Sequence, residues 1–205
     1  MTLQRKITRS IKKNLSFYLT GSLLTAITVM LLIGAFAVSE SLYTWADAYY
    51  EKTNIEDASF QTQIPITEEE MAELEKNYAL TLEKQEYLDF SYQDTKLRLF
   101  SPTEKMDYYT ITVGSDLKEP GDILLTYRYA KANNIAIGDT MVIGQDGTEG
   151  KSFTVRGLIM KSDYAVMLYD LTETAADKSG FGIGIVYPED FAVLGNGALQ
   201  YSVLY

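Results

Sequence analysis

Residues 15–39 read LSFYLTGSLLTAITVMLLIGAFAVS and carry no charged side chain, and no Asp or Glu occurs before Glu40. At about 1.5 Å of rise per residue, a helix over this stretch is about 37 Å long, enough to cross a hydrocarbon core of ~30 Å with some tilt. Five basic residues precede it: Arg5, Lys6, Arg9, Lys12 and Lys13. This charge asymmetry predicts a plasma-membrane protein with residues 1–14 in the cytoplasm and residues 40–205 outside it.

A cleaved signal peptide is the alternative interpretation of the same stretch. Ala35-Phe36-Ala37 fits a small-x-small cleavage pattern, and a basic segment precedes the apolar one. The apolar regions of signal peptides are shorter, at about 7–15 residues, which favours an uncleaved anchor. Aromatic residues that suit the two membrane interfaces also flank the stretch: Phe17, Tyr18, Tyr43, Trp45, Tyr49 and Tyr50. Both interpretations place residues 40–205 outside the cytoplasm.

The first half of the apolar stretch is rich in small and hydroxyl side chains. Gly21 with Thr25, and Ser22 with Ala26, form small-xxx-small pairs, a spacing that lets two membrane helices approach closely. The alternative is that the Ser and Thr hydroxyls bond back to their own helix, as they do in many membrane helices. The pairs favour a helix that packs in a bundle.

Composition restricts the chemistry of the exported part. It carries 13 basic residues against 28 acidic ones, so its net charge is −15, which argues against binding of nucleic acid or anionic headgroups. The chain has no Cys and no His, which excludes disulfides, thiol nucleophiles, imidazole bases and the common zinc sites. Carboxylate chemistry and oxygen-ligand metal sites remain open.

The exported part divides into a helical extension and one domain. Leu42–Lys52 continues the helix as a juxtamembrane segment within residues 40–56, and residues 57–205 suffice for one domain with a sizeable core. Periodicity predicts helices near 67–78, 127–134 and after Pro188, and strands over 58–64, 80–92, 96–100, 108–113, 123–126, 140–143, 152–160, 181–187 and 201–205. We therefore expect an α+β domain with a mainly antiparallel sheet, in which residues 80–112 form a meander.

The sequence clearly predicts where the first helix of the domain begins. Thr67 with Glu70 three residues later is a capping box, and Ile66 with Met71 suits a hydrophobic staple. The helical spacing predicts a buried face made of Met71, Leu74 and Tyr78. Acidic residues crowd this helix: Glu68, Glu69, Glu70, Glu73 and Glu75. A capped, solvated helix explains them better than a calcium site, because no Asp-x-Asp-x-Asp-Gly loop accompanies them.

Two glycine-containing segments have structural explanations. Gly138-Asp139 marks a turn that opens a hairpin, whose loop at residues 144–151 contains Asp146-Gly147. Residues 179–184 read SGFGIG, which has neither the spacing of a dinucleotide-binding loop nor that of a P-loop. We expect a strand there, with glycines that permit close packing.

From about Ile11 to Tyr205 the elements occur in a recognisable order. The segments are IKKNLSFYL, YYEKTNIEDASF, PITEEEMAELEK, EPGDILLTYRYAKANNIAIGDTMVIG, KSFTVRGLIMKSDY and FGIGIVYPEDFAVL. The outer domains of FtsX/MacB-type ABC transporter permeases contain a recurring series of elements: a strand, a short helix, x-Gly-Asp, a strand and a strand with Val-x-Gly. The chain resembles the N-terminal part of that family, especially its large members in Gram-positive bacteria, with a domain of the MacB-like periplasmic core type.

The resemblance implies a mechanical function. In that family a separate cytoplasmic ABC ATPase drives the permease, and the first helix transmits motion to the outer domain, for export of a lipid or peptide or for mechanotransmission. The implied partners are this ATPase, other permease helices or a second permease copy, and membrane lipid. No catalytic, cofactor-binding or metal-binding residue is expected, and the mechanical residues are Leu15–Val38 and Leu42–Lys52.

The chain lacks the second, third and fourth membrane helices of the family and its coupling helix. Tyr205 also closes an apolar run without a polar tail, so we expect an N-terminal fragment of a longer protein.

Two alternatives belong to other functional classes. One is a single-pass anchored module that binds a partner through its acidic domain. The other is an anchored enzyme that uses carboxylates, for which four acids are available: Asp89, Asp94, Asp163 and Asp170. Nothing in the sequence pairs these acids, and acid–base catalysis needs two groups in contrasting environments.

Overall fold

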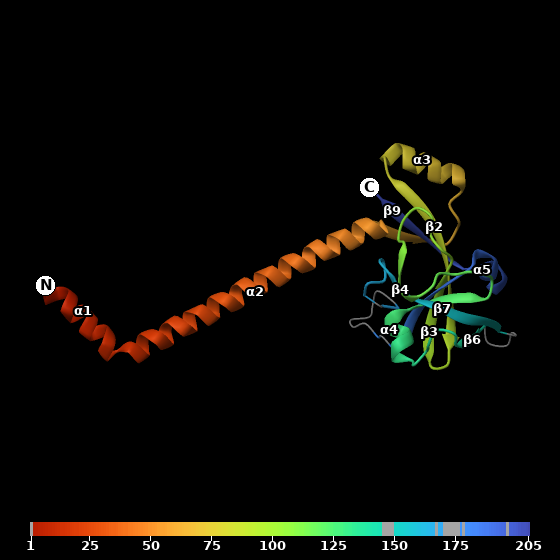
Figure 1. The fold of residues 1–205 in the computed structure, drawn as a ribbon. Helices are drawn as coiled ribbons and strands as arrows, with labels where there is room; N and C mark the ends of the chain where they lie inside the picture. The colour runs from red at the N-terminus through yellow and green to blue at the C-terminus, as the bar shows by residue number, and fades with distance from the viewer. Residues whose placement is uncertain (1, 145–149, 167, 170–176, 178, 196) are drawn as a thin grey trace. The chain divides into compact units, whose positions relative to one another are not determined.

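The computed structural model describes residues 2–144, 150–166, 168–169, 177, 179–195 and 197–205 (Figure 1). Contacts divide the chain into two compact units, Met1–Tyr49 and Tyr50–Tyr205. The boundary lies within a helix, so the last turn of that helix belongs to the second unit.

The first unit is helical throughout its described length. Helix α1 (Thr2–Lys13) is followed by helix α2 (Leu15–Thr53), and a turn at Asn14 separates them. The 39 residues of α2 confirm the prediction that the apolar helix continues through Leu42–Lys52 without a break. By length and composition α2 is able to cross a membrane, and its apolar window is fully exposed. Helix α1 was not predicted, although Ile7 and Ile11 follow each other at a helical spacing of four residues in its polar sequence.

The second unit contains nine strands and three helices among its described residues, in the predicted order. The strands are β1 (Ala58–Thr62), β2 (Thr81–Tyr92), β3 (Thr95–Phe100), β4 (Tyr109–Gly114), β5 (Asp122–Thr126), β6 (Thr140–Ile143), β7 (Lys151–Lys161), β8 (Phe181–Val186) and β9 (Ala198–Leu204). The helices are α3 (Glu68–Tyr78), α4 (Tyr127–Ala132) and α5 (Pro188–Leu194). The α+β class is therefore confirmed.

The strands form one mixed sheet in the order β1-β9-β2-β3-β8-β5-β7-β4, with β6 paired to β7. The pairs β3–β8 and β5–β7 are parallel, and the others are antiparallel. The predicted meander over residues 80–112 is wrong in its third strand. Strand β4 lies beside β7 at the far edge, and β8 takes the place next to β3. All six residues of β8 are buried, which suits an interior position, whereas four of the six residues of β4 are exposed.

Strand β8 separates two apolar clusters. Ile183 and Ile185 belong to one cluster, whereas Gly182 and Gly184 face the other. A Cβ atom on Gly182 would lie 2.4 Å from Cγ of Tyr129, and one on Gly184 would lie 2.5 Å from Cδ2 of Leu99. Because alternate strand residues point to opposite faces, the two glycines leave room on their own face for the bulky side chains of Tyr129 and Leu99. The expectation of close packing is confirmed.

Helix α3 packs at one end of the sheet, beside β2 (Figure 1). Its capping box is present, with the Glu70 amide donating to Oγ1 of Thr67 at 3.3 Å. Met71 is buried and Leu74 packs against the same cluster, as predicted. The prediction for Tyr78 is wrong, since its side chain is 67% exposed. Ala79 takes a left-handed conformation that ends the helix, and Leu80 packs in its place.

The predicted turn and hairpin before β7 are confirmed. Gly138 has a φ of 94°, and the Ala136 amide donates to Oδ2 of Asp139 at 2.8 Å. Strands β6 and β7 then pair antiparallel. Asp146-Gly147 in their loop lie outside the described residues.

Candidate functional site at the end of the long helix

Helix α2 ends in a Schellman motif inside the second unit. Asn54 has a φ of 47°, its amide donates to the Glu51 carbonyl at 3.4 Å, and the Ile55 amide donates to the Tyr50 carbonyl at 3.3 Å. Asn is one of the few residues that adopt the left-handed conformation readily, so the sequence suits a sharp stop here. The helix therefore ends in a defined geometry, and the chain turns directly into β1.

Hydrogen bonds fasten this helix end to the segment before β4. The Asn54 side-chain amide donates to the Lys105 carbonyl at 2.7 Å, and the Asp107 amide donates to the Asn54 carbonyl at 3.0 Å. The Tyr108 amide donates to the Thr53 carbonyl at 2.9 Å. Thr53 itself is buried. Carbonyls at a helix C-terminus have no partner within the helix, so these bonds give the last turn tertiary partners.

The residues after the turn are fastened as well. The Glu56 amide donates to Oδ1 of Asp107 at 2.9 Å, and the Asp57 amide donates to the Val203 carbonyl at 2.8 Å. The Tyr205 amide in turn donates to Oδ2 of Asp57 at 2.8 Å. The segment 53–57, which we call the anchor segment, is thus bound on one side by residues 105–108 and on the other by β9.

The segment before β4, which is hydrogen-bonded to the anchor segment, is itself hydrogen-bonded to β2. The carboxylate of Glu83 on β2 accepts the amides of Glu104, Lys105 and Met106 at 2.6, 3.1 and 2.8 Å. The Met106 side chain is fully buried. Three successive amides are thereby bonded to one side chain of β2, so the segment that contacts the helix end is itself fixed to the sheet.

A buried polar cluster lies behind the anchor segment. The Gln85 amide donates to Oδ2 of Asp107 and to Oγ of Ser202, both at 3.2 Å. The Lys161 ammonium pairs with Asp163, and both side chains are almost completely buried. Burial raises the pKa of the Asp163 carboxyl, although Lys161 opposes the shift.

Beside this cluster, Arg98 joins two strands through a bidentate ion pair. Its Nε and Nη2 donate to the Asp89 carboxylate at 2.7 and 2.8 Å, and its Nη1 donates to the Tyr164 hydroxyl at 3.1 Å. The guanidinium carbon lies 4.1 Å from the centre of the Tyr87 ring. Burial raises the pKa of the Tyr164 hydroxyl to about 12. The arrangement is structural, since each polar group is occupied by a neighbour.

The four acids considered for catalysis are not brought together as an acid–base pair among the described residues. Asp89 is held by Arg98 and Asp163 by Lys161, while Asp94 lies in the exposed turn between β2 and β3. Asp170 lies outside the described residues. Within the described ranges, no group of three or more acids has the arrangement of a metal site.

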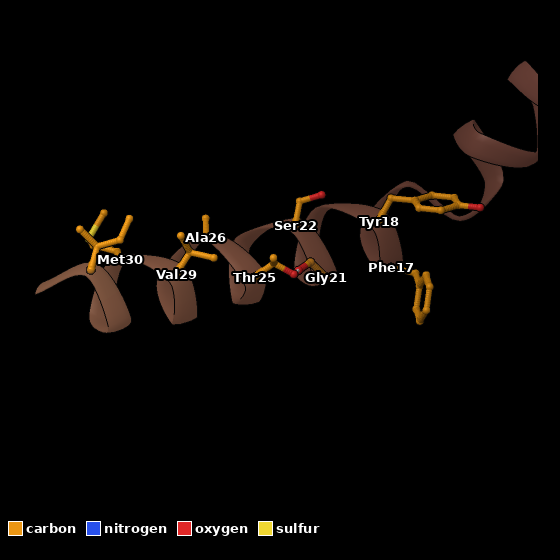
Figure 2. Close-up of a pocket in the computed structure, with 9 residues that line it drawn as sticks. Phe17, Tyr18, Gly21, Ser22, Thr25, Ala26, Val29 and Met30 are labelled. Atoms are coloured by element: carbon orange, nitrogen blue, oxygen red, sulfur yellow. The ribbon is translucent and has the colours of Figure 1, made fainter. Parts of the chain in front are cut away.

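The small residues of α2 leave a shallow groove on the helix, shown in Figure 2. Phe17 and Tyr18 stand at one end and Val29 and Met30 at the other, with small side chains between them: Gly21, Ser22, Thr25 and Ala26. The Thr25 hydroxyl donates to the Gly21 carbonyl at 2.9 Å. Thr20 and Thr28 bond back in the same way. These three threonine hydroxyls therefore have hydrogen-bond partners within the helix, and the groove presents a surface of small residues.

No protein-family model matches this chain, and neither does any curated protein. The small-residue pairs and the course of α2 through residues 42–52 were predicted from the sequence, whereas the anchor segment was missed. Asn54 directly after a helical run was an available signal, because Asn suits a left-handed helix end. The partners Gln85, Asp107 and Lys161 carried no signal, since they come from distant parts of the chain.

Proposed function

We propose that the chain is the first membrane helix and the outer domain of an ABC transporter permease of the FtsX/MacB type. In this proposal a separate cytoplasmic ATPase drives the permease, and the outer domain moves to export a lipid or peptide or to act on an external partner. The observation that carries the proposal is the junction at the end of α2, where an uninterrupted helix enters the domain through a fastened segment and not through a flexible linker.

The junction between α2 and the domain is suited to transmit force. A helix of 39 residues is about 58 Å long, and its internal hydrogen bonds keep it stiff along its axis. A displacement at one end of such a rod is lost if the other end joins the domain through a Gly- or Ser-rich linker. Residues 53–57 read TNIED and each end of this segment is hydrogen-bonded to the domain, so the junction favours transmission.

The groove on α2 supports a helix that packs against other membrane helices. Small residues let helix backbones approach closely in lipid, where apolar surface alone gives no preference for protein over lipid. The occupants we propose are the other helices of the permease. Trp45 and Tyr49, whose rings stack at 5.5 Å, suit the outer interface.

The orientation can be tested cleanly because the chain has no cysteine. Two single-cysteine variants, Lys6→Cys and Lys118→Cys, are exposed to a membrane-impermeant maleimide on intact cells. We expect labelling of the Lys118→Cys protein, and labelling of the Lys6→Cys protein only after the cells are permeabilised. Equal labelling of both positions in intact cells contradicts the topology.

The assembly is tested by purifying the tagged protein from native membranes in mild detergent. We expect an ATPase with Walker motifs to co-purify, and we expect the double variant Gly21→Leu/Ala26→Leu to lose it. The matched control is Leu31→Phe, which lies outside the groove and keeps the partner. Recovery of the chain without any ATPase, in both wild type and control, contradicts the permease and leaves an anchored binding module.

A further inference from the structure

The polar cluster behind the anchor segment has more buried acceptors than donors. Among the described residues, four buried side-chain oxygens in this region lack a hydrogen-bond partner: Glu56 Oε2, Gln85 Oε1, Asp163 Oδ1 and Ser162 Oγ. The first three are acceptors only, and just the Ser162 hydroxyl is able to donate. Buried polar groups normally have partners, so a concentration of unpaired acceptors at one place calls for an additional donor.

The cluster also carries excess negative charge. Glu56, Asp107 and Asp163 each contribute a carboxyl group, and the charges of both aspartates act on Glu56. Lys161 is the cation that pairs with Asp163. If all three carboxyls are ionised, the cluster has a net charge of −2, and like charges in a buried place disfavour full ionisation.

Two of the unpaired oxygens belong to side chains that are directed into the cluster. Gln85 is 5% exposed, and its amide nitrogen already donates to Asp107 and Ser202, so its oxygen belongs to the same hydrogen-bonded group. The Asp163 side chain is 2% exposed and pairs with Lys161 through its other oxygen. These are built positions in the interior and not a patch of surface acids.

We propose that this cluster binds a proton on Glu56 and acts as a latch, which holds the anchor segment when protonated and loosens it when the proton leaves. The proton supplies the missing donor and removes one charge from a group of three. Glu56 is suited to carry it, because its own amide donates to Asp107 and its Oε2 is buried without a hydrogen-bond partner, two residues before β1. The inference does not depend on transport activity.

The pH dependence has a definite sign. Burial raises the pKa of Glu56, with the charges of Asp107 and Asp163 adding to the shift and the hydroxyls of Ser202 and Ser59 opposing it. A carboxyl whose pKa is higher in the folded state stabilises the fold below its ordinary pKa of 4.5, and this stabilisation is lost as the pH rises through the raised value. The latch is therefore tight below the ordinary pKa of 4.5 and loosens as the pH rises through the raised value.

The test measures hydrogen exchange of the Asp107 and Tyr108 amides, which donate to the Asn54 and Thr53 carbonyls. The full chain is studied in detergent micelles between about pH 4 and about pH 8, with rates corrected for intrinsic exchange. We expect protection to fall with rising pH, by about tenfold for each unit by which folding raises the pKa. The Glu56→Gln protein, which mimics the protonated group, should keep its protection at all these pH values.

Two further variants separate the latch from a general effect on stability. Glu73→Gln changes an exposed acid on α3 and should keep the wild-type pH dependence. Ser59→Ala removes a hydroxyl that lowers the pKa of Glu56, so the midpoint of the transition should move to higher pH. A merely structural role of Ser59 does not move that midpoint.

Three outcomes overturn the proposal. The first is wild-type protection that does not change with pH, and the second is a Glu56→Gln protein that keeps the wild-type pH dependence. The third is restoration of protection at about pH 8 by millimolar CaCl₂, because the cluster then binds a cation and not a proton. If Glu56→Gln does not fold, the wild-type and Ser59→Ala midpoints decide the question by themselves.

Discussion

The two ends of helix α2 differ in their exposure and in their hydrogen bonds. Near its start, the residues of the groove are exposed, and the Thr25 hydroxyl donates to a carbonyl of the helix itself. At its end, Thr53 is buried and Asn54 is bonded through its carbonyl and its side chain. The described residues of the apolar window are thus exposed, whereas the last turn of the helix is held by hydrogen bonds within the second unit.

The two ends therefore differ in what stabilises them: in the proposed membrane setting, lipid or other helices surround the start of α2, whereas hydrogen bonds within the chain hold its end. If α2 spans a membrane as we propose, its apolar side chains need no specific partner there, so the start of α2 is available for packing. Polar groups in a protein interior need defined partners, so the end of α2 is specified by a few hydrogen bonds. Substitutions near the end should therefore change domain stability, and substitutions near the start should not.

The largest effect should come from the ion pair behind the anchor. Lys161→Met leaves Asp163 buried without its cation, and removing one member of a buried pair costs roughly 3–5 kcal/mol. We expect this loss in urea unfolding followed by near-ultraviolet circular dichroism of the tyrosines. Lys84→Met, which breaks the more exposed pair with Glu86, should cost roughly 0–1 kcal/mol. Similar losses in both variants contradict a special role for the buried pair.

A comparison of two glycines tests the difference between the regions directly. In Gly182→Ala the new methyl group would lie 2.4 Å from the Tyr129 ring, and overpacking of this kind costs roughly 1–3 kcal/mol. Nothing lies within 4 Å of the corresponding atom at Gly21, so Gly21→Ala should leave the unfolding of the domain unchanged. Urea midpoints of the two variants provide the measurement. Destabilisation of the domain by Gly21→Ala means that the start of α2 is not free.

The anchor itself is probed at Asn54. Asn54→Ala forces a less suitable residue into the left-handed conformation and removes the bond to the Lys105 carbonyl, for a total of about 2 kcal/mol. Asn54→Gly removes the same bond but tolerates the backbone conformation, so it should lose about half as much. Faster exchange of the Tyr108 amide should accompany both losses. Equal losses in the two variants show that the backbone conformation contributes nothing.

The smallest effect should be local to α3. Thr67→Ala removes the acceptor for the Glu70 amide and should cost about 1 kcal/mol, seen as faster exchange in the first turn of that helix. The amides of Asp107 and Tyr108 should keep their protection, because the capping box and the anchor share no residue. Loss of protection at both places means that α3 and the anchor unfold together.

The sequence by itself determined the features that depend on neighbours in the chain. The uncharged run of residues 15–39 specifies a long apolar helix, and Thr67 with Glu70 specifies the start of α3. The order of strands and helices and the hairpin of β6 with β7 followed in the same way. These signals are local, because helical and strand periodicity and turn chemistry act over a few residues.

Only the tertiary structure decided which strands lie side by side and which polar groups meet. Strand β8 enters between β3 and β5 because an entirely buried strand needs neighbours on both sides, a requirement that no local pattern expresses. Tyr78 points to solvent because Ala79 ends α3 one residue later. Gln85, Asp107 and Lys161 come from separate elements, and their common environment arises from burial and charge after the chain has folded.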